Sequence, residues 1–128
     1  MTDLKRQKQK AMQPLIPSEH DEQCDFVEWL EVNRYKFSAI PNATWTSMSQ
    51  QQKNKKEGVR AGLPDLLIIV RNQIVWIEMK KKIYKNRKNG GLSENQMAWH
   101  DVLNACDNCQ VFIAYGADEA RSIITRIK

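Results

Sequence analysis

The sequence lacks several features that would assign a protein class directly. Its 128 residues hold only three cysteines, too few for a disulfide-built scaffold, and such sparing use suits a reducing cytosol. The apolar run at residues 66–70 has five residues, far short of the ~20 that a membrane helix needs. The first ten residues are polar and basic without an apolar segment behind them, so we expect no signal peptide. These absences predict a cytoplasmic protein with no membrane partner.

The composition that remains is that of an ordinary globular domain. Apolar residues make up 41% of the chain and charged residues 27%, which excludes a wholly disordered or a collagen-like chain. A chain of this length forms one domain and buries roughly two-thirds of its unfolded surface.

Charge is distributed unevenly along the chain, whose formal net charge is +5. Residues 17–32 hold six acids and no Lys or Arg, whereas residues 50–90 hold eleven basic residues against three acids. A basic surface of this kind favours a polyanion partner, most simply nucleic acid, although solvated lysine loops are the alternative. The candidate DNA-binding residues are Lys53, Lys55, Lys56, Arg60, Lys81, Lys82, Lys85, Arg87 and Lys88.

The pattern of apolar, capping and turn residues predicts an α/β fold with the element order αβββαβα. Residues 1–17 are expected to form a flexible basic arm, because Pro14 and Pro17 block a regular helix. Residues 18–128 should form a single domain with a mixed central sheet flanked by helices. The expected helices span 18–32, 94–106 and 118–127, and the expected strands span 35–40, 66–70, 74–77 and 111–115. The basic stretches 50–62 and 81–91 are predicted to be loops.

The first predicted helix carries an inward-facing acid. Ser18 has capping-box spacing to an acid three residues later and should begin the helix. On a helical wheel the apolar stripe consists of Phe26, Val27 and Leu30, and Glu19 falls inside it. A buried carboxylate is costly unless it is paired or binds a metal. The alternative is that Glu19 complements the helix dipole and points to water.

A predicted hairpin gathers two more acids and a lysine. A two-residue turn at Asn72 and Gln73 would pair Asp65 with Lys80 and place Glu78 on the same face. One explanation is a structural salt bridge between Asp65 and Lys80. The other is a hard-metal site, because Mg²⁺ binds a few carboxylate oxygens together with waters and substrate phosphate. Such an ion activates water, and the lysine can position that water or neutralise developing charge.

These residues and their spacing resemble the motif of the PD-(D/E)XK nuclease superfamily. That motif corresponds here to Pro64-Asp65, twelve intervening residues, and then Glu78-Met79-Lys80. Further segments resemble the VRR-NUC family within it: Glu19 with Gln23, the stretch from Gly58 to Leu66, Leu92 to Gln96 followed by Trp99, and Val111 to Ala120. The resemblance covers about residues 18–125 and is nearest to short stand-alone phage and bacterial members.

The resemblance implies a restriction-endonuclease-like core and Mg²⁺-dependent hydrolysis of DNA phosphodiesters, with Mn²⁺ as a substitute and no nucleotide cofactor. Branched DNA, especially the four-way (Holliday) junction, is the implied substrate, and a homodimer is the implied assembly. Glu19, Asp65, Glu78 and the main-chain carbonyl of Met79 would bind the metal. Lys80 would be the catalytic lysine, acting with Asp65 and Glu78. The alternatives are a nuclease for flaps or single-strand/duplex junctions, and a non-catalytic DNA-binding protein on the same fold.

Three further signals have competing interpretations. By the resemblance Gln96 supports catalysis, but Ser93 and Gln96 also have capping-box spacing. The pair Cys106 and Cys109 invites a zinc or redox interpretation, but two cysteines with scattered histidines make a weak zinc signal, so a structural turn is favoured. His100 is expected to be a surface or half-buried helix residue rather than a general base.

Overall fold

The structure is a computed structural model that describes residues 17–41 and 47–128. All of the predicted N-terminal arm except Pro17 lies outside the described residues.

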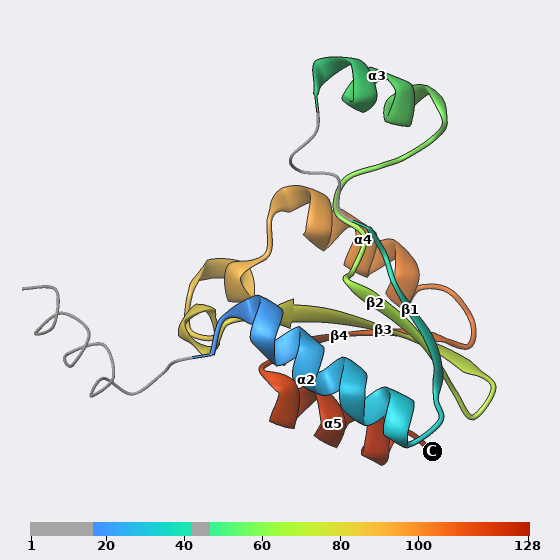
Figure 1. Cartoon of the computed structure of the whole chain (residues 1–128), viewed down its shortest axis with the longest axis vertical. Helices are drawn as coiled ribbons and strands as arrows, with labels where there is room; N and C mark the ends of the chain where they lie inside the picture. The colour runs from blue at the N-terminus through green and yellow to red at the C-terminus, as the bar shows by residue number, and fades with distance from the viewer. Residues whose placement is uncertain (1–16, 42–46) are drawn as a thin grey trace, which may run out of the picture.

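The core of the fold is a four-stranded mixed sheet in the order β1-β2-β3-β4 (Figure 1). Its strands are β1 (Lys36–Ala39), β2 (Leu66–Val70), β3 (Gln73–Lys80) and β4 (Cys109–Tyr115). The first three strands pair antiparallel, and β4 pairs parallel to β3 along seven residues. The predicted α/β class with a mixed sheet is therefore confirmed.

Helices cover both faces of this sheet. Helices α2 (Glu19–Val32) and α5 (Ala117–Arg126) lie side by side on one face, and α4 (Glu94–Asn104) lies on the other (Figure 1). The core between the sheet and the α2/α5 layer includes Phe26, Leu30, Ile68, Ile77 and Ile124, all of them almost fully buried. Since strand residues alternate in direction, the positions between these apolar residues point toward α4.

Helices α2 and α4 begin where the sequence predicts. Ser18 caps α2 and Ser93 caps α4, each in a capping box with both reciprocal hydrogen bonds formed. The N-terminus of α5 is capped from a distance instead, because the backbone N–H of Ala117 donates to Glu22 Oε2 at 2.7 Å. That bond joins the two helices of one layer at the end where α5 begins.

The predicted hairpin turn is displaced by one residue. Val70 pairs with Gln73, so the turn consists of Arg71 and Asn72, with φ of 49° and 65°. Positive φ at both central residues is typical of a type I′ turn, whose twist matches that of the strands. The prediction that Asp65 pairs with Lys80 is therefore wrong, since this register places Asp65 opposite Glu78. Moving the turn by one residue changes the partner of each β2 residue by two positions on β3. Every side chain therefore keeps its predicted face.

The predicted loop at 50–62 contains a helix instead. Helix α3 (Met48–Lys56) begins at Ser47, whose side chain accepts a hydrogen bond from the Gln50 backbone N–H. None of its side chains is buried, and it projects away from the sheet (Figure 1). Without an apolar stripe the helix has no periodic signal, which explains the wrong prediction.

The second basic stretch is compact rather than regular. It contains two short 3₁₀ turns, η1 (Lys82–Tyr84) and η2 (Lys88–Gly91). Tyr115 anchors it by donating a hydrogen bond to the Gly90 carbonyl at 2.8 Å. No helix in the described ranges is long and apolar enough to cross a membrane.

Candidate active site

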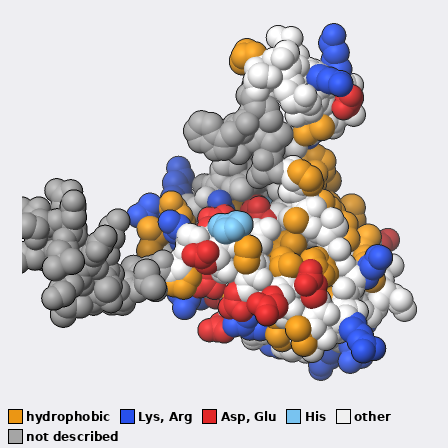
Figure 2. All heavy atoms as spheres, in the orientation of Figure 1, with side chains coloured by type: hydrophobic (Ala, Val, Ile, Leu, Met, Phe, Trp, Pro, Cys, Tyr) orange, Lys and Arg blue, Asp and Glu red, His pale blue; other side chains and the backbone are white. Residues whose placement is uncertain are grey.

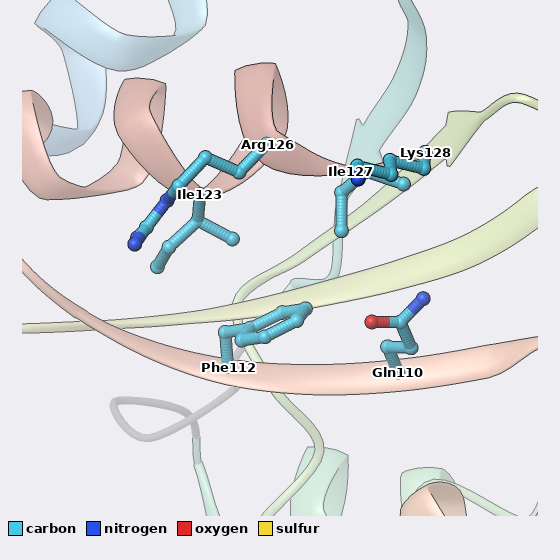
Figure 3. A pocket seen from close by; sticks show the side chains of 6 residues that line it. All are labelled: Gln110, Phe112, Ile123, Arg126, Ile127 and Lys128. Atoms are coloured by element: carbon cyan, nitrogen blue, oxygen red, sulfur yellow. The ribbon is translucent and has the colours of Figure 1, made fainter.

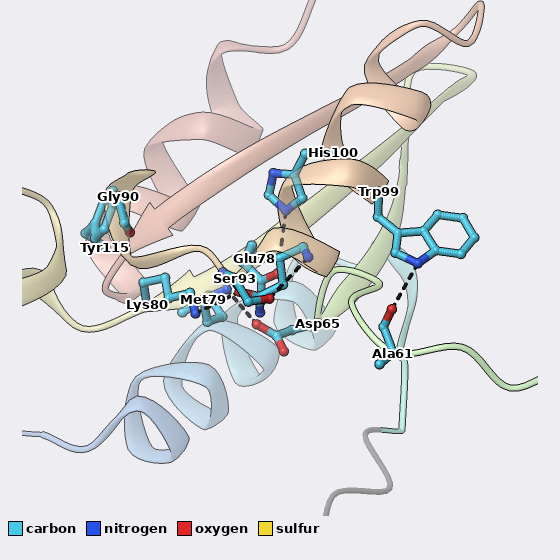
Figure 4. A network of polar contacts seen from close by, with 11 residues as sticks. Ala61, Asp65, Glu78, Met79, Lys80, Gly90, Ser93, Trp99, His100 and Tyr115 are labelled. Atoms are coloured by element: carbon cyan, nitrogen blue, oxygen red, sulfur yellow. Dashed lines mark hydrogen bonds and ion pairs between the residues drawn. The ribbon is translucent and has the colours of Figure 1, made fainter. Parts of the chain in front are cut away.

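Two carboxylates meet where the β2–β3 hairpin opens. Asp65 directly precedes β2, and its Oδ2 accepts a hydrogen bond from the Met79 backbone N–H at 2.7 Å (Figure 4). Its own backbone carbonyl accepts from Ile40 N at 2.8 Å, which ties it to the end of β1. Glu78 lies in β3 with only 2% of its surface exposed. The end of the sheet thus holds both acids in a fixed arrangement.

Burial and mutual proximity perturb both acids. Burial raises the pKa of Asp65 to about 7, and hydrogen bonding with Glu78 and the negative charge of Glu78 add to this rise. Burial also raises the pKa of Glu78. Two acids in one desolvated site favour holding a proton or another positive charge between them. This arrangement fits a cation-binding site better than a purely structural one.

Glu78 has a neighbour, His100, that the sequence analysis did not place at the site. His100 Nε2 in α4 lies 3.5 Å from Glu78 Oε1, and both side chains are buried (Figure 4). Neither atom has a hydrogen-bond partner among the described residues. Burial lowers the pKa of His100, which favours its neutral form. The expectation that His100 is a surface or half-buried residue was wrong. Its position four residues after Gln96 puts the two side chains on one face of the helix, and this spacing could have placed His100 near the site.

Lys80 and Gln96 come together across the site. Lys80 Nζ donates to Gln96 Oε1 at 3.3 Å, and the same oxygen accepts from the Ser93 backbone N–H at 2.9 Å. The two interpretations of Gln96 are therefore compatible, because one side chain caps α4 and also contacts the lysine. Capping fixes the position of the amide, and the amide in turn fixes the lysine.

Glu19 lies at the edge of this group. It is half-buried in the first turn of α2, and burial together with the charge of Asp65 raises its pKa. The nearby ammonium groups of Lys80 and Lys81 act in the opposite direction. Half-burial and the influence of Asp65 agree with the predicted inward orientation of Glu19, and the resulting electrostatic group contains three acids and two lysines.

The described residues fit a divalent cation in part. Among residues 17–41 and 47–128, no three His, Cys, Asp or Glu side chains stand close enough to hold a metal as they are placed. The pair Asp65 and Glu78 nevertheless supplies hard oxygen ligands, and Glu78 Oε1 has no hydrogen-bond partner among the described residues. Mg²⁺ typically takes one or two protein carboxylates and completes its shell with waters and substrate phosphate. The pair therefore suits Mg²⁺ better than a metal that needs a full protein cage.

The predicted DNA-binding residues lie on or just after α3 and in the stretch after β3, and they differ in how free their side chains are. Three lysines, Lys53, Lys55 and Lys56, lie on the exposed helix α3, and Figure 2 shows Lys and Arg side chains at this projecting end. Lys81, Lys82 and Lys88 are exposed in the stretch after β3. The remaining three have protein contacts: Arg60 donates to the Lys55 and Val59 carbonyls, Lys85 pairs with Glu119 at 3.2 Å, and Arg87 lies over the Tyr84 ring.

Two other features lie away from the carboxylates. The three cysteines are free, and no metal-binding group forms around them among the described residues. A hollow of about 470 Å³ between β4 and α5 is lined in part by Phe112, Ile123 and Arg126 (Figure 3). None of the predicted site residues lines this hollow.

A mixed sheet that carries Asp65, Glu78 and Lys80 at one end, with a helix on each side, defines a nuclease-type α/β domain. The sequence matches the VRR-NUC domain family over residues 5–118, and the chain belongs to this family. Its substrate class is accordingly DNA.

Two solved structures share this fold. One is a VRR_NUC domain protein that is 23% identical to this chain, with a TM-score of 0.64. The match covers 86% of this chain and 87% of that protein's chain. Another is a VRR_NUC domain that is 21% identical to this chain, with a TM-score of 0.59. This match covers 86% of this chain and 97% of the other. No curated protein matches the chain.

Proposed function

We propose that this protein is a metal-dependent, structure-selective DNA endonuclease that resolves four-way junctions. The observation that carries the proposal is the pair of a half-buried Asp65 and a buried Glu78 beside Lys80. A protein that only binds DNA gains nothing from buried carboxylates facing phosphates, because like charges repel. A divalent cation removes that conflict.

Mg²⁺, or Mn²⁺ in its place, would be held by the pair Asp65 and Glu78, and a movement of the Glu19 side chain would let it join them, with the main-chain carbonyl of Met79 as a further ligand. When bound, such an ion lowers the pKa of a water and offsets negative charge on the phosphate. In the hydrolysis the water oxygen forms a bond to phosphorus and the bond to the leaving oxygen breaks. One product ends in a phosphate and the other in a hydroxyl.

Lys80 supplies positive charge next to the carboxylates. Its ammonium group is directed by Gln96, whose oxygen is fixed by the cap of α4. A positioned cation of this kind stabilises charge that develops on a phosphate oxygen, and it does so without reorganisation during the reaction. Lys80 therefore acts on the reacting phosphate, whereas Gln96 positions Lys80.

The basic residues on α3 and after β3 would hold the DNA backbone. They flank the carboxylates on two sides in the sequence, since α3 precedes Asp65 and the stretch with η1 and η2 follows Lys80. Each phosphate that they neutralise releases counterions, so affinity should fall steeply with salt. A homodimer would place two such sites about a two-fold axis, which suits paired cuts in a four-way junction.

The test is a cleavage assay on labelled four-way junction, flap, single-stranded and linear duplex DNA with Mg²⁺, Mn²⁺ or EDTA. We expect metal-dependent paired incisions in the junction, which Asp65→Asn and Lys80→Ala abolish while DNA binding persists. Asp107→Asn, an exposed acid in the turn before β4, is the matched control and should cleave at the wild-type rate.

The outcomes separate the alternatives. Cleavage mainly of flaps or single-strand/duplex junctions would keep the chemistry and replace the resolvase assignment. Binding without cleavage of any substrate would favour a non-catalytic DNA-binding protein. Wild-type cleavage by Asp65→Asn would refute the assigned site.

A further inference from the structure

A pocket next to the carboxylates is not used by the chemistry proposed above. It has a volume of about 320 Å³ and is lined by Ile40, Pro41, Gly58, Val59, Arg60, Leu63 and Trp99. That volume is at the lower end of the range for small organic ligands, about 300–1,000 Å³. The lining is largely apolar with one planar cation, Arg60, so the pocket suits a flat, uncharged ring.

The aromatic wall of the pocket is held in place. Trp99 Nε1 donates a hydrogen bond to the Ala61 carbonyl at 3.0 Å, and the indole is turned away from His100 toward this segment (Figure 4). Gly62 lies so close to α4 that a Cβ there would approach the Asn95 backbone to 2.8 Å. The segment that forms one wall is therefore pressed against the helix that forms the other.

The pocket is joined to the active site through two short chain segments. Leu63 lines the pocket and Asp65 follows two residues later. On the other wall, Trp99 lines the pocket, and the next residue, His100, contacts Glu78. A nucleotide whose phosphate lies at the carboxylates thus has its neighbour within reach of the pocket.

The charge around the pocket fits the same ligand. Residues 47–63 carry four basic residues against one acid, and Arg60 lies in the lining itself. A DNA strand that crosses this region would have its backbone on the basic side and a base directed to the apolar side. Bases stack on aromatic side chains without strong sequence preference, because every base has a π face.

We propose that this pocket binds one unpaired nucleobase of the DNA substrate, stacked on Trp99. The inference rests on the proposed function, and it adds a physical basis for structure selectivity. A base in perfect duplex is stacked and paired and does not enter the pocket, whereas a base at a branch point or in a single strand does. The pocket beside the catalytic carboxylates then determines which DNA structures are cleaved.

The test is DNA binding in EDTA, where cleavage is absent. Fluorescence anisotropy gives Kd for a linear duplex, for the same duplex with a single-stranded extension, and for that extension made of abasic nucleotides. Trp99→Leu should weaken binding of the extended duplex by about tenfold, the effect of losing one stacked base. It should leave the linear and abasic substrates unchanged, and Trp99→Phe should restore most of the affinity.

Two further variants keep the result interpretable. If Trp99→Leu fails to fold, as judged by circular dichroism, Val59→Gln changes the pocket at a residue that is 49% exposed. Trp29→Phe changes a tryptophan stacked between Phe26 and Tyr35, far along the chain from the pocket, and should bind all substrates normally.

Each outcome has one meaning. Equal losses on abasic and base-containing DNA, or no loss in Trp99→Leu, would overturn the base pocket and leave the nuclease proposal standing. Equal losses in Trp99→Phe and Trp99→Leu would assign Trp99 a purely structural hydrogen bond, which also overturns it. Absence of DNA binding by the wild-type protein would refute the proposed function itself.

Discussion

Replacing Asp65 by asparagine should stabilise the metal-free protein at alkaline pH while it abolishes cleavage. The pKa of Asp65 is raised from 3.8 to about 7 by burial, with Glu78 as the second cause. The folded protein therefore binds this proton more tightly than the unfolded chain. The resulting stability is fully present below pH 3.8 and is lost as the pH rises through about 7.

The magnitude follows from the pKa shift. One pKa unit corresponds to about 1.4 kcal/mol, and the range from pH 5 to pH 8 includes about two of the three units of this shift. The upper limit is thus about 3 kcal/mol, and water access to Asp65 reduces it by about half. We expect the wild-type protein to lose about 1.5 kcal/mol from this group over that range.

Asparagine removes the titration and keeps the local geometry. Its amide oxygen can accept the hydrogen bond that Met79 N–H donates to Asp65, and its NH₂ group can donate to Glu78. The stability of Asp65→Asn relative to wild type should therefore increase by about 1.5 kcal/mol from pH 5 to pH 8. Titrating groups that do not interact with Asp65 are present in both proteins and cancel in this difference.

The assay is urea unfolding in EDTA at pH 5 and pH 8, followed by tryptophan fluorescence. Asp107→Asn serves as the control and should follow the wild type at both pH values. Added Mg²⁺ at pH 8 should raise the unfolding midpoint of the wild type and have little effect on Asp65→Asn, since a ligand stabilises only the protein that binds it. A stability difference between Asp65→Asn and wild type that is the same at both pH values would refute the reasoning.

Three further substitutions test neighbouring parts of the site. Gln96→Ala should cost about 1 kcal/mol in thermal unfolding through the lost cap and slow junction cleavage at least tenfold, whereas a cleavage rate equal to wild type would exclude a role for this amide. Glu22→Ala should cost about 1 kcal/mol, because Ala117 N–H loses a charged acceptor, and should leave the cleavage rate per folded molecule unchanged. Gly62→Ala should cost about 2 kcal/mol or more, because φ is +104° and the new Cβ would meet the Asn95 backbone; unchanged melting would contradict that contact.

The placement of the site acids was predictable because it depends on two local patterns. Side chains alternate between the two faces of a strand, and apolar residues recur along one face of a helix. Glu19 was assigned from its place in an apolar helical stripe, and half-burial near Asp65 agrees with that assignment. Asp65, Glu78 and Lys80 were assigned to one face of a hairpin. Although the turn lies one residue earlier, the two-residue change in pairing preserved the face and altered only which residue Asp65 opposes.

The features that could not be predicted depend on contacts between distant segments or lack an apolar pattern. The contact of His100 with Glu78 requires α4 to pack on one particular face of β3, which local sequence does not specify. Helix α3 buries no side chain, so no hydrophobic period marks it. The closeness of Gly62 to α4 is likewise a tertiary contact, invisible in the segment itself.

Helix α4 connects these observations, because three of its residues act on three parts of the site. Gln96, Trp99 and His100 are spaced by three and four residues and therefore lie on one face of the helix. Gln96 contacts Lys80, Trp99 forms a wall of the pocket, and His100 contacts Glu78. The capping box that begins α4 fixes the Gln96 amide, and the contacts of Gln96, Trp99 and His100 with other segments set the orientation of the helix. The lysine, the carboxylate pair and the pocket are thus held in register by one short helix whose start is set by two hydrogen bonds.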